Sequence, residues 1–282
     1  RVAGRTAVGL VGRADDPGVP PGREEEHPTR DPERHPDLQG QALAGHDPAD
    51  ATSSREPVPR YAASLHAGIA GLRVGVVEHL LDPDLVAPGV AAAVEAAIGE
   101  LQRLGARVER ADCAFLRRAE VVQQLVMLPE AAEVHLPWLR SRLGEYGADV
   151  RARLLAGLLL PATATVTGQR ARRALAEEAR ALHARHDLLV APAMPVTAPP
   201  LDDLTVRVGG RELPYRAALI PFNSPWSCLG LPAASVPCGL DEGLPVGLAL
   251  VGRRFGEATV LRAAHAYQQV TDWHERRPPI AV

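Results

Sequence analysis

Serine, cysteine and histidine side chains are the groups through which this chain could perform nucleophilic chemistry. A serine nucleophile requires a base and donors for the developing oxyanion, yet none of the serines lies in a Gly-x-Ser-x-Gly turn, which would expose such a nucleophile. Ser53 and Ser54 follow a His-Asp-Pro turn, where hydroxyl groups commonly cap a loop or a helix. Ser235 lies inside an apolar run, and we interpret it as structural.

Two cysteines and two histidines are the remaining candidates. For Cys228 and Cys238, a thiol nucleophile and a buried structural role are alternatives. The structural role is favoured, since buried cysteine commonly acts as a small apolar residue and the sequence does not show whether a histidine lies near either thiol. His183 and His186 are three residues apart in a helical stretch, which could supply half of a metal site. No cluster of matching spacing accompanies them, so we predict no metal site. The sequence contains no glycine-rich phosphate loop either, and we predict no cofactor.

The clearest pattern of glycine, proline and apolar residues lies at 229–250. The elements it forms would hold any neighbouring site in place. Gly-Leu-Pro-Ala-Ala-Ser-Val-Pro-Cys-Gly at 230–239 is followed by Gly-Leu-Pro-Val-Gly-Leu-Ala-Leu at 243–250. Apolar runs bounded by glycine and proline predict two buried strands, joined by a connection of hairpin length at 239–243. A rigid hairpin of this kind either lines a pocket or only completes the core, and the pattern leaves both alternatives open.

The other elements alternate between strand and helix. A strand at 72–77, an amphipathic helix at 88–104 and a strand at 107–109 predict a βαβ unit and therefore parallel strands. Further along, the pattern predicts helix over 114–160 with breaks near Pro129 and Pro137, helix over 163–186, a strand at 187–192, a small hairpin at 204–214 and a final helix at 257–271.

The composition limits the partners and the compartment. The chain has 282 residues and a net charge of -3, which does not favour nucleic acid or an anionic membrane as a partner. No apolar run approaches the roughly 20 residues of a spanning helix. Three scattered cysteines indicate reduced thiols rather than a disulfide framework, so we expect a cytoplasmic protein. All 31 basic residues are arginine, and lysine is absent.

The chain is expected to have three parts. Residues 1–40 form a polar segment rich in proline and charge, which we expect to be disordered because it cannot bury enough apolar surface to offset its ordering entropy. Residues 41–276 have the composition of a folded domain, and residues 277–282 form a short tail.

Residues 187–276 resemble the amidase signature family, which comprises amide-hydrolysing serine enzymes and the A subunit of glutamyl-tRNA amidotransferase. The resemblance rests on Asp-Leu-Leu-Val-Ala-Pro at 187–192, Pro-Val-Thr-Ala-Pro at 195–199, Pro-Phe-Asn at 221–223 and the two runs at 230–239 and 243–247. A Gly-His-Asp-Pro turn at 45–48 extends it upstream, so that it spans about residues 42–276.

The resemblance implies that residues 41–276 are an amidase-like domain and that the chain is the C-terminal half of an α/β/α sandwich built on a mixed sheet. Catalysis in the family uses a lysine, a serine in a cis peptide and a nucleophilic serine in a Gly/Ser-rich run. This chain has no lysine, and neither Gly209-Gly210 nor Ser53-Ser54 lies in such a run. No catalytic residue is therefore carried over from the family. In the family these residues precede the Gly-His-Asp-Pro turn, where this chain has the polar segment 1–40, so the resemblance implies that this segment is out-of-frame or a junction.

The resemblance also implies that 222–230 and the 192–197 loop border the acyl pocket. The substrate-binding residues it predicts are Pro195, Phe222, Asn223, Trp226 and Gly230. By the resemblance, an amidotransferase subunit is expected to place an acidic side chain just before the Gly-Leu-Pro turn, where it would hold an amino-acid substrate. No acidic residue lies between Arg216 and Gly230, so the resemblance favours an amidase acting on a less polar amide. A purely structural role for these residues is equally compatible with the sequence.

Three functional hypotheses follow. The first is an amidase that hydrolyses the carbon–nitrogen bond of a small carboxamide in its full-length parent, of which this chain is an inactive fragment. The second is a non-catalytic remnant, either a pseudoenzyme or a partner-binding half-domain. The third is a different hydrolase that uses Cys228 or Cys238 as its nucleophile.

Overall fold

A computed structural model describes residues 41 and 43–277. The chain divides into two units, residues 1–35 and 36–282, and the described residues all belong to the second unit. The polar segment predicted at 1–40 and all but the first residue of the 277–282 tail lie outside the described residues.

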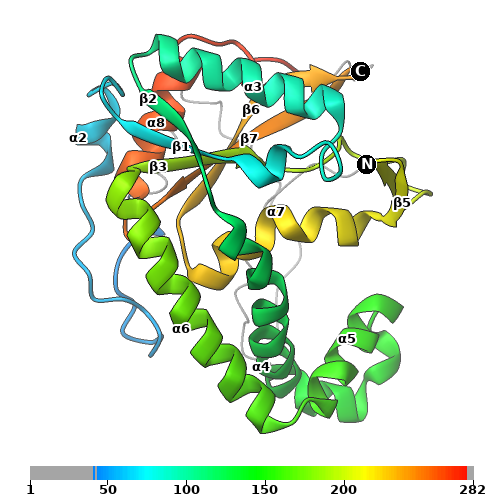
Figure 1. The fold of residues 1–282 in the computed structure, drawn as a ribbon. Helices are drawn as coiled ribbons and strands as arrows, with labels where there is room; N and C mark the ends of the chain where they lie inside the picture. Colours follow the sequence, from blue (N-terminus) through cyan, green and yellow to red (C-terminus); the bar gives the residue numbers. More distant parts are fainter. Residues whose placement is uncertain (1–40, 42, 278–282) are drawn as a thin grey trace, which may run out of the picture. The chain divides into compact units, whose positions relative to one another are not determined.

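A five-stranded mixed sheet forms the centre of the described unit (Figure 1). Its strand order is β2-β1-β3-β7-β6, with β1 parallel to β2 and β3, and β7 antiparallel to both β3 and β6. The bounds of the strands are β1 Arg73–Val77, β2 Arg107–Ala111, β3 Leu188–Pro192, β6 Ala233–Asp241 and β7 Leu244–Gly252. The predicted α/β fold with a mixed sheet is confirmed.

The predicted βαβ unit is present as β1, helix α3 (Pro88–Arg103) and β2. Pro88 occupies the first turn of α3, where its missing N–H costs nothing, and Gly105 follows the helix with a φ of 88°. The helix buries one stripe against the sheet, made of Val90, Val94, Ala97, Ile98 and Leu101. This stripe packs mainly over β6, β7 and β3.

The hairpin predicted at 229–250 is formed by β6 and β7. Its loop is shorter than the expected 239–243 connection, because Asp241 still pairs with Leu244 and only Glu242 and Gly243 turn the chain. Both loop residues have positive φ, 50° and 80°, which is the type I′ geometry that matches strand twist. A register shift between Pro237 and Gly239 marks a β-bulge in β6.

Four helices pack together below the sheet in the view of Figure 1, and α5 lies farthest from it, against α4. Their bounds are α4 Ala119–Ser141, α5 Ala148–Leu159, α6 Ala162–Arg185 and α7 Tyr215–Leu229. The breaks predicted near Pro129 and Pro137 are wrong, because α4 continues through both prolines. Each proline removes one helical hydrogen bond, but α4 packs against α5, α6 and α7 along its length, and this packing holds it helical. Helix α7 likewise contains Pro221 and Pro225.

The remaining described elements are short. Helix α2 (Tyr61–Leu65) packs against α8 (Glu257–Gln268), and β4 (Thr205–Val208) pairs with β5 (Arg211–Pro214) in the predicted small hairpin. Helix α8 ends at Gln268, before the predicted end at Thr271, and Val270 beyond it is 49% exposed. Within the described ranges, no helix combines the length and the apolar character needed to cross a bilayer.

Gly252 offers a test of this packing. A Cβ at Gly252 would lie 2.7 Å from Val260 Cγ2 and 3.1 Å from the Gly256 carbonyl oxygen, so β7 approaches α8 too closely for a side chain. We predict that Gly252→Ala lowers the free energy of unfolding by about 1–3 kcal/mol. The matched control is Gly99→Ala inside α3, where nothing lies within 4 Å, and it should raise stability by about 0.5–1 kcal/mol. Urea unfolding measures both, and equal effects would contradict the packing.

Candidate substrate site

A cavity of about 370 Å³ opens between the loop that follows β3 and the β6–β7 hairpin. Its wall combines apolar side chains with three hydroxyl groups, and none of the described residues lining it is charged. The lining residues are Val90, Ala193, Met194, Val196, Thr197, Ala198, Tyr215, Ser235, Pro237, Pro245, Val246 and Gly247. Such a wall suits a small neutral molecule that carries a few hydrogen-bonding groups.

Backbone hydrogen bonds hold the loop in place over the hairpin. The Ala193 N–H donates to the Gly247 carbonyl oxygen at 2.8 Å, which continues the β3–β7 pairing beyond Pro192. On the other side, the Ala87 N–H donates to the Pro195 carbonyl oxygen at 2.8 Å. A Cβ at Gly247 would lie 2.7 Å from Ser235 Oγ, so the glycine allows the loop and both strands to meet closely at the cavity.

The predicted pocket residues occupy different environments. Pro195 is buried, and its carbonyl oxygen accepts the hydrogen bond from Ala87. Asn223 is exposed, with its Nδ2 3.5 Å from Met194 Sδ and donating to the Leu219 carbonyl oxygen at 3.2 Å, so it touches the cavity wall through Met194. Phe222 and Trp226 lie in the main core, only 1% and 5% exposed.

Gly230 ends helix α7 and turns the chain toward β6. Its φ of 63° is left-handed, and the Leu231 N–H donates to the Trp226 carbonyl oxygen at 3.0 Å, the bond of a Schellman cap. Gly230 therefore sets the direction in which the chain enters the hairpin, and it does not line the cavity.

Sequence reasoning missed two residues that line the cavity. The sequence pattern favours a structural role for Ser235, but this residue is exposed on β6 and its hydroxyl faces the cavity beside Gly247. Tyr215 begins α7 directly after β5, and no motif marks it. Strand alternation could have signalled Ser235, because its neighbour Val236 is buried.

A second cavity, of about 300 Å³, contains the types of residue found in serine hydrolases. Ser224, His79 and Asp82 all line it. However, Ser224 Oγ and His79 Nδ1 are both buried without a hydrogen-bond partner among the described residues. The serine and the histidine are therefore not joined as a nucleophile and its base. The His46–Ser53 pair, bonded at 3.2 Å, is exposed and belongs to the 46–53 turn, where the Asp47 N–H also donates to Ser53 Oγ.

The cysteines lie in the interior. Cys113, Cys228 and Cys238 are all free and buried. Burial raises the pKa of the Cys238 thiol to about 12, and burial, opposed by nearby Arg172, raises the pKa of Cys228. These thiols are therefore protonated at neutral pH, which disfavours either as a nucleophile.

His183 and His186 are not arranged to bind one metal ion together. His186 lies just beyond the end of α6, and its ring nitrogens lie 3.1 Å from the Leu182 carbonyl oxygen and 2.7 Å from Glu109 Oε1. His183 Nδ1 lies 3.3 Å from the His186 carbonyl oxygen. Among residues 41 and 43–277, no group of three or more His, Cys, Asp or Glu side chains could hold a metal ion.

Comparison with known proteins identifies the family. The family model described as Amidase matches residues 38–261. An amidase from Pseudomonas putida is 36% identical over 241 residues, which covers 85% of this chain and 52% of the relative. The A subunit of the glutamyl-tRNA(Gln) amidotransferase from Moorella thermoacetica is 33% identical, covering 86% of this chain and 53% of that protein. This chain belongs to the amidase family, and it spans about half the length of the curated relatives it matches.

Solved structures have the same fold. A vestigial protein complex, described as revealing the evolutionary origins of an s-triazine catabolic enzyme, aligns with a TM-score of 0.74 and 30% identity, over 83% of this chain and 50% of that one. The A subunit of the glutamyl-tRNA(Gln) amidotransferase from Thermotoga maritima aligns with a TM-score of 0.65 and 27% identity, over 83% and 50% of the two chains.

The buried thiols lead to a prediction on reactivity. At neutral pH, an excess of a small alkylating reagent should leave Cys113, Cys228 and Cys238 of the native protein unmodified, because each is buried and protonated. After unfolding in urea, the same reagent should modify all three thiols, as intact-protein mass spectrometry can count. Fast native modification of Cys228 or Cys238 would revive the thiol-nucleophile hypothesis.

The same burial predicts loss of stability in alkali. Burial raises the pKa of the Cys113 and Cys238 thiols from the ordinary 9.0 to about 12. Between these values the unfolded chain loses protons that the folded chain keeps, so stability is intact below pH 9 and falls as the pH rises toward 12. Urea midpoints measured across this range should decline less steeply in Cys238→Ala. An identical slope would contradict the raised pKa.

Proposed function

We propose that this chain forms the substrate-pocket wall of an amidase that acts on neutral carboxamides, and that bond cleavage requires catalytic groups this sequence does not supply. The observation that carries the proposal is the uncharged cavity between the 193–198 loop and the β6–β7 hairpin, which lies within the residues that match the family model.

The chemistry of the cavity wall suits an amide. An amide accepts a hydrogen bond at its carbonyl oxygen and donates from its N–H, and the hydroxyls of Thr197, Tyr215 and Ser235 can do both. Met194 and Val196 offer apolar contact to the acyl group. A charged amino-acid substrate would have to leave its charges unpaired against this wall, which is costly. The wall therefore favours a general amidase over a member of the amidotransferase branch.

The proposal that the chain is inactive alone rests on its side chains. The resemblance assigns catalysis to a lysine and two serines, and this chain has no lysine. The buried cysteines are protonated, and Ser224 is not bonded to His79. The alternative is a non-catalytic remnant or a partner-binding pseudoenzyme, in which the same cavity has no substrate.

The partners and the compartment follow from the same features. We expect a small-molecule amide as the ligand and no nucleic-acid partner, given the net charge of -3. Three free thiols support a reducing compartment, and we therefore propose the cytoplasm.

The first test is turnover by the purified chain. We predict no release of ammonia above the buffer rate from benzamide or propionamide, because the chain lacks an activated nucleophile. Pseudomonas putida amidase, assayed in parallel, is the positive control. Turnover that copurifies with the chain would contradict the proposal.

The second test asks whether the cavity works when a complete catalytic apparatus is present. In a chimera, residues 41–276 replace the matching part of Pseudomonas putida amidase, and we predict hydrolysis of neutral amides. Val196→Asp in the chimera should raise KM about tenfold or more, because it places a charge in an apolar wall. The control Val166→Asp, at a half-exposed position on α6, should leave KM unchanged. A folded but inactive chimera would favour the remnant hypothesis.

A further inference from the structure

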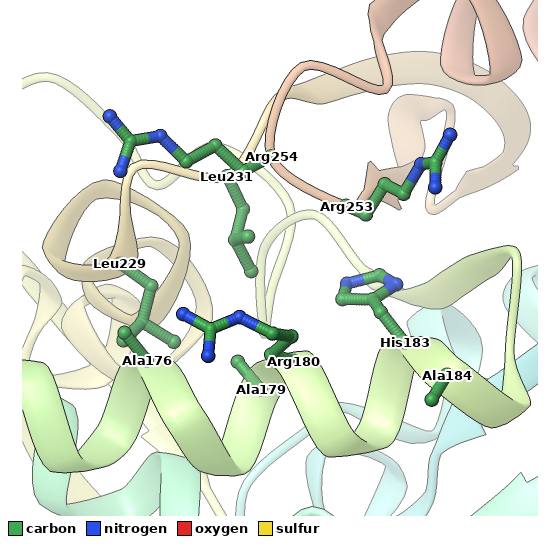
Figure 2. A pocket seen from close by; sticks show the side chains of 9 residues that line it. All are labelled: Ala176, Ala179, Arg180, His183, Ala184, Leu229, Leu231, Arg253 and Arg254. Carbon is green, nitrogen blue, oxygen red and sulfur yellow. The ribbon is translucent and has the colours of Figure 1, made fainter.

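Two cavities share residues at the C-terminal end of α6. Neither shares a lining residue with the cavity between the 193–198 loop and the β6–β7 hairpin, which is called the amide cavity below. The first, of about 350 Å³, lies between α6, the end of α7 and the segment after β7 (Figure 2). The second, of about 540 Å³, reaches α8 and also has Arg262 in its wall. His183, Ala184 and Arg253 line both cavities. In Figure 2 the His183 ring points from α6 toward the segment that carries Arg253.

His183 presents an unsatisfied acceptor at this position. The residue is 9% exposed, and its Nδ1 faces the His186 carbonyl oxygen at 3.3 Å, so Nδ1 carries the proton. Burial lowers the pKa of His183, and the charge of Arg253 lowers it further, against the hydrogen bond to His186 and the charge of Asp187, which raise it. The net shift is downward and favours the neutral ring. Its Nε2 is then a lone-pair acceptor, buried without a partner among the described residues. Such an atom requires an O–H or N–H donor.

The surrounding charges leave a positive excess. Arg73 is paired with Asp187 at 2.6 Å, and Arg180 with Glu177, so the cations and anions of these two pairs cancel. Arg254 lies over the ring of Phe255 at 5.0 Å. In the part of the chain that the structure describes, the side chains of Arg253 and Arg262 form no hydrogen bond or ion pair, and Arg262 Nε is buried without a partner. Arg262 Nε therefore lacks an acceptor and His183 Nε2 lacks a donor, while the exposed guanidinium of Arg253 adds a second positive charge.

We propose that the cavity lined by His183, Arg253 and Arg262 binds the phosphate group of a small phosphate monoester. A singly protonated phosphate offers acceptor oxygens to both guanidinium groups and its own O–H to His183 Nε2, so it satisfies all three side chains at once. Sulfate and carboxylate ions offer acceptors alone and leave the imidazole unsatisfied. Because this site shares no residue with the amide cavity, it stands or falls independently of the proposed function.

The test is calorimetric titration of the purified chain with methyl phosphate at pH 6, near the second pKa of a phosphate monoester. We predict saturable binding with a Kd of about 1 mM or tighter. Arg253→Gln, at an exposed position, should weaken binding about ten- to a hundredfold, since it removes a charge-assisted bond. Arg173→Gln removes the same charge from an exposed position of α6 outside both cavities and should change nothing.

The identity of the ion tests the role of His183. Sulfate and acetate should each bind about tenfold or more weakly than methyl phosphate, because neither donates to Nε2 at this pH. Inorganic phosphate should bind like methyl phosphate if the phosphate group alone is recognised. Absence of saturable methyl phosphate binding, equal binding by Arg253→Gln, or sulfate or acetate binding as tightly as methyl phosphate would each overturn the proposal. His183→Gln adds a direct test, and if it fails to fold, the ranking of the ions still decides.

Discussion

The pairing of β7 with β3 on one side and β6 on the other is the constraint on which the rest of the described structure depends. Leu248, fully buried, is the register partner of both Pro192 and Val236. From this register the hydrogen bond from Ala193 to Gly247 places the 193–198 loop over the hairpin and creates the amide cavity. At the other end of β7, Gly252 pairs with Leu188, which brings Arg253 to the end of α6. Strand β7 therefore positions the amide cavity near its first residues and the wall that carries Arg253 beyond its last residue.

Sequence patterns predicted the elements whose limits are set by local chemistry. Glycine and proline delimit the β6–β7 hairpin, and Pro88 and Gly105 bound α3, so these elements were found close to their observed positions. The same rule failed at Pro129 and Pro137, because a proline shows the cost of a lost hydrogen bond but not the packing that offsets it. The prolines of α7 concealed a helix for the same reason.

The candidate site was predictable as a region but not as a set of contacts. The resemblance pointed to the 192–197 loop, and the cavity lies there. Ser235 and Tyr215 reach that cavity through tertiary structure: one by the alternation of β6, the other by the docking of α7. Phe222 and Trp226 have aromatic side chains suited to a pocket wall, but only the packing of α7 reveals that they are buried in the core. Long-range contacts of this kind are not encoded in local spacing.

The family assignment and the side chains of this chain together separate substrate binding from bond cleavage. The chain belongs to the amidase family, covers about half the length of its curated relatives and contains no lysine. Its uncharged cavity suits the recognition of a neutral amide, whereas its buried, protonated thiols and the unbonded Ser224 do not suit nucleophilic attack. The central claim is that this chain binds a neutral amide but does not hydrolyse it.

Backbone amide NMR of the isotope-labelled chain, titrated with benzamide, tests that claim most directly. The account predicts saturable chemical-shift changes concentrated at the non-proline residues of 193–198 and at 235, 236, 246 and 247, with benzamide intact at the end of the titration. Changes confined to other parts of the chain, no changes at all, or conversion of benzamide to benzoate would contradict it.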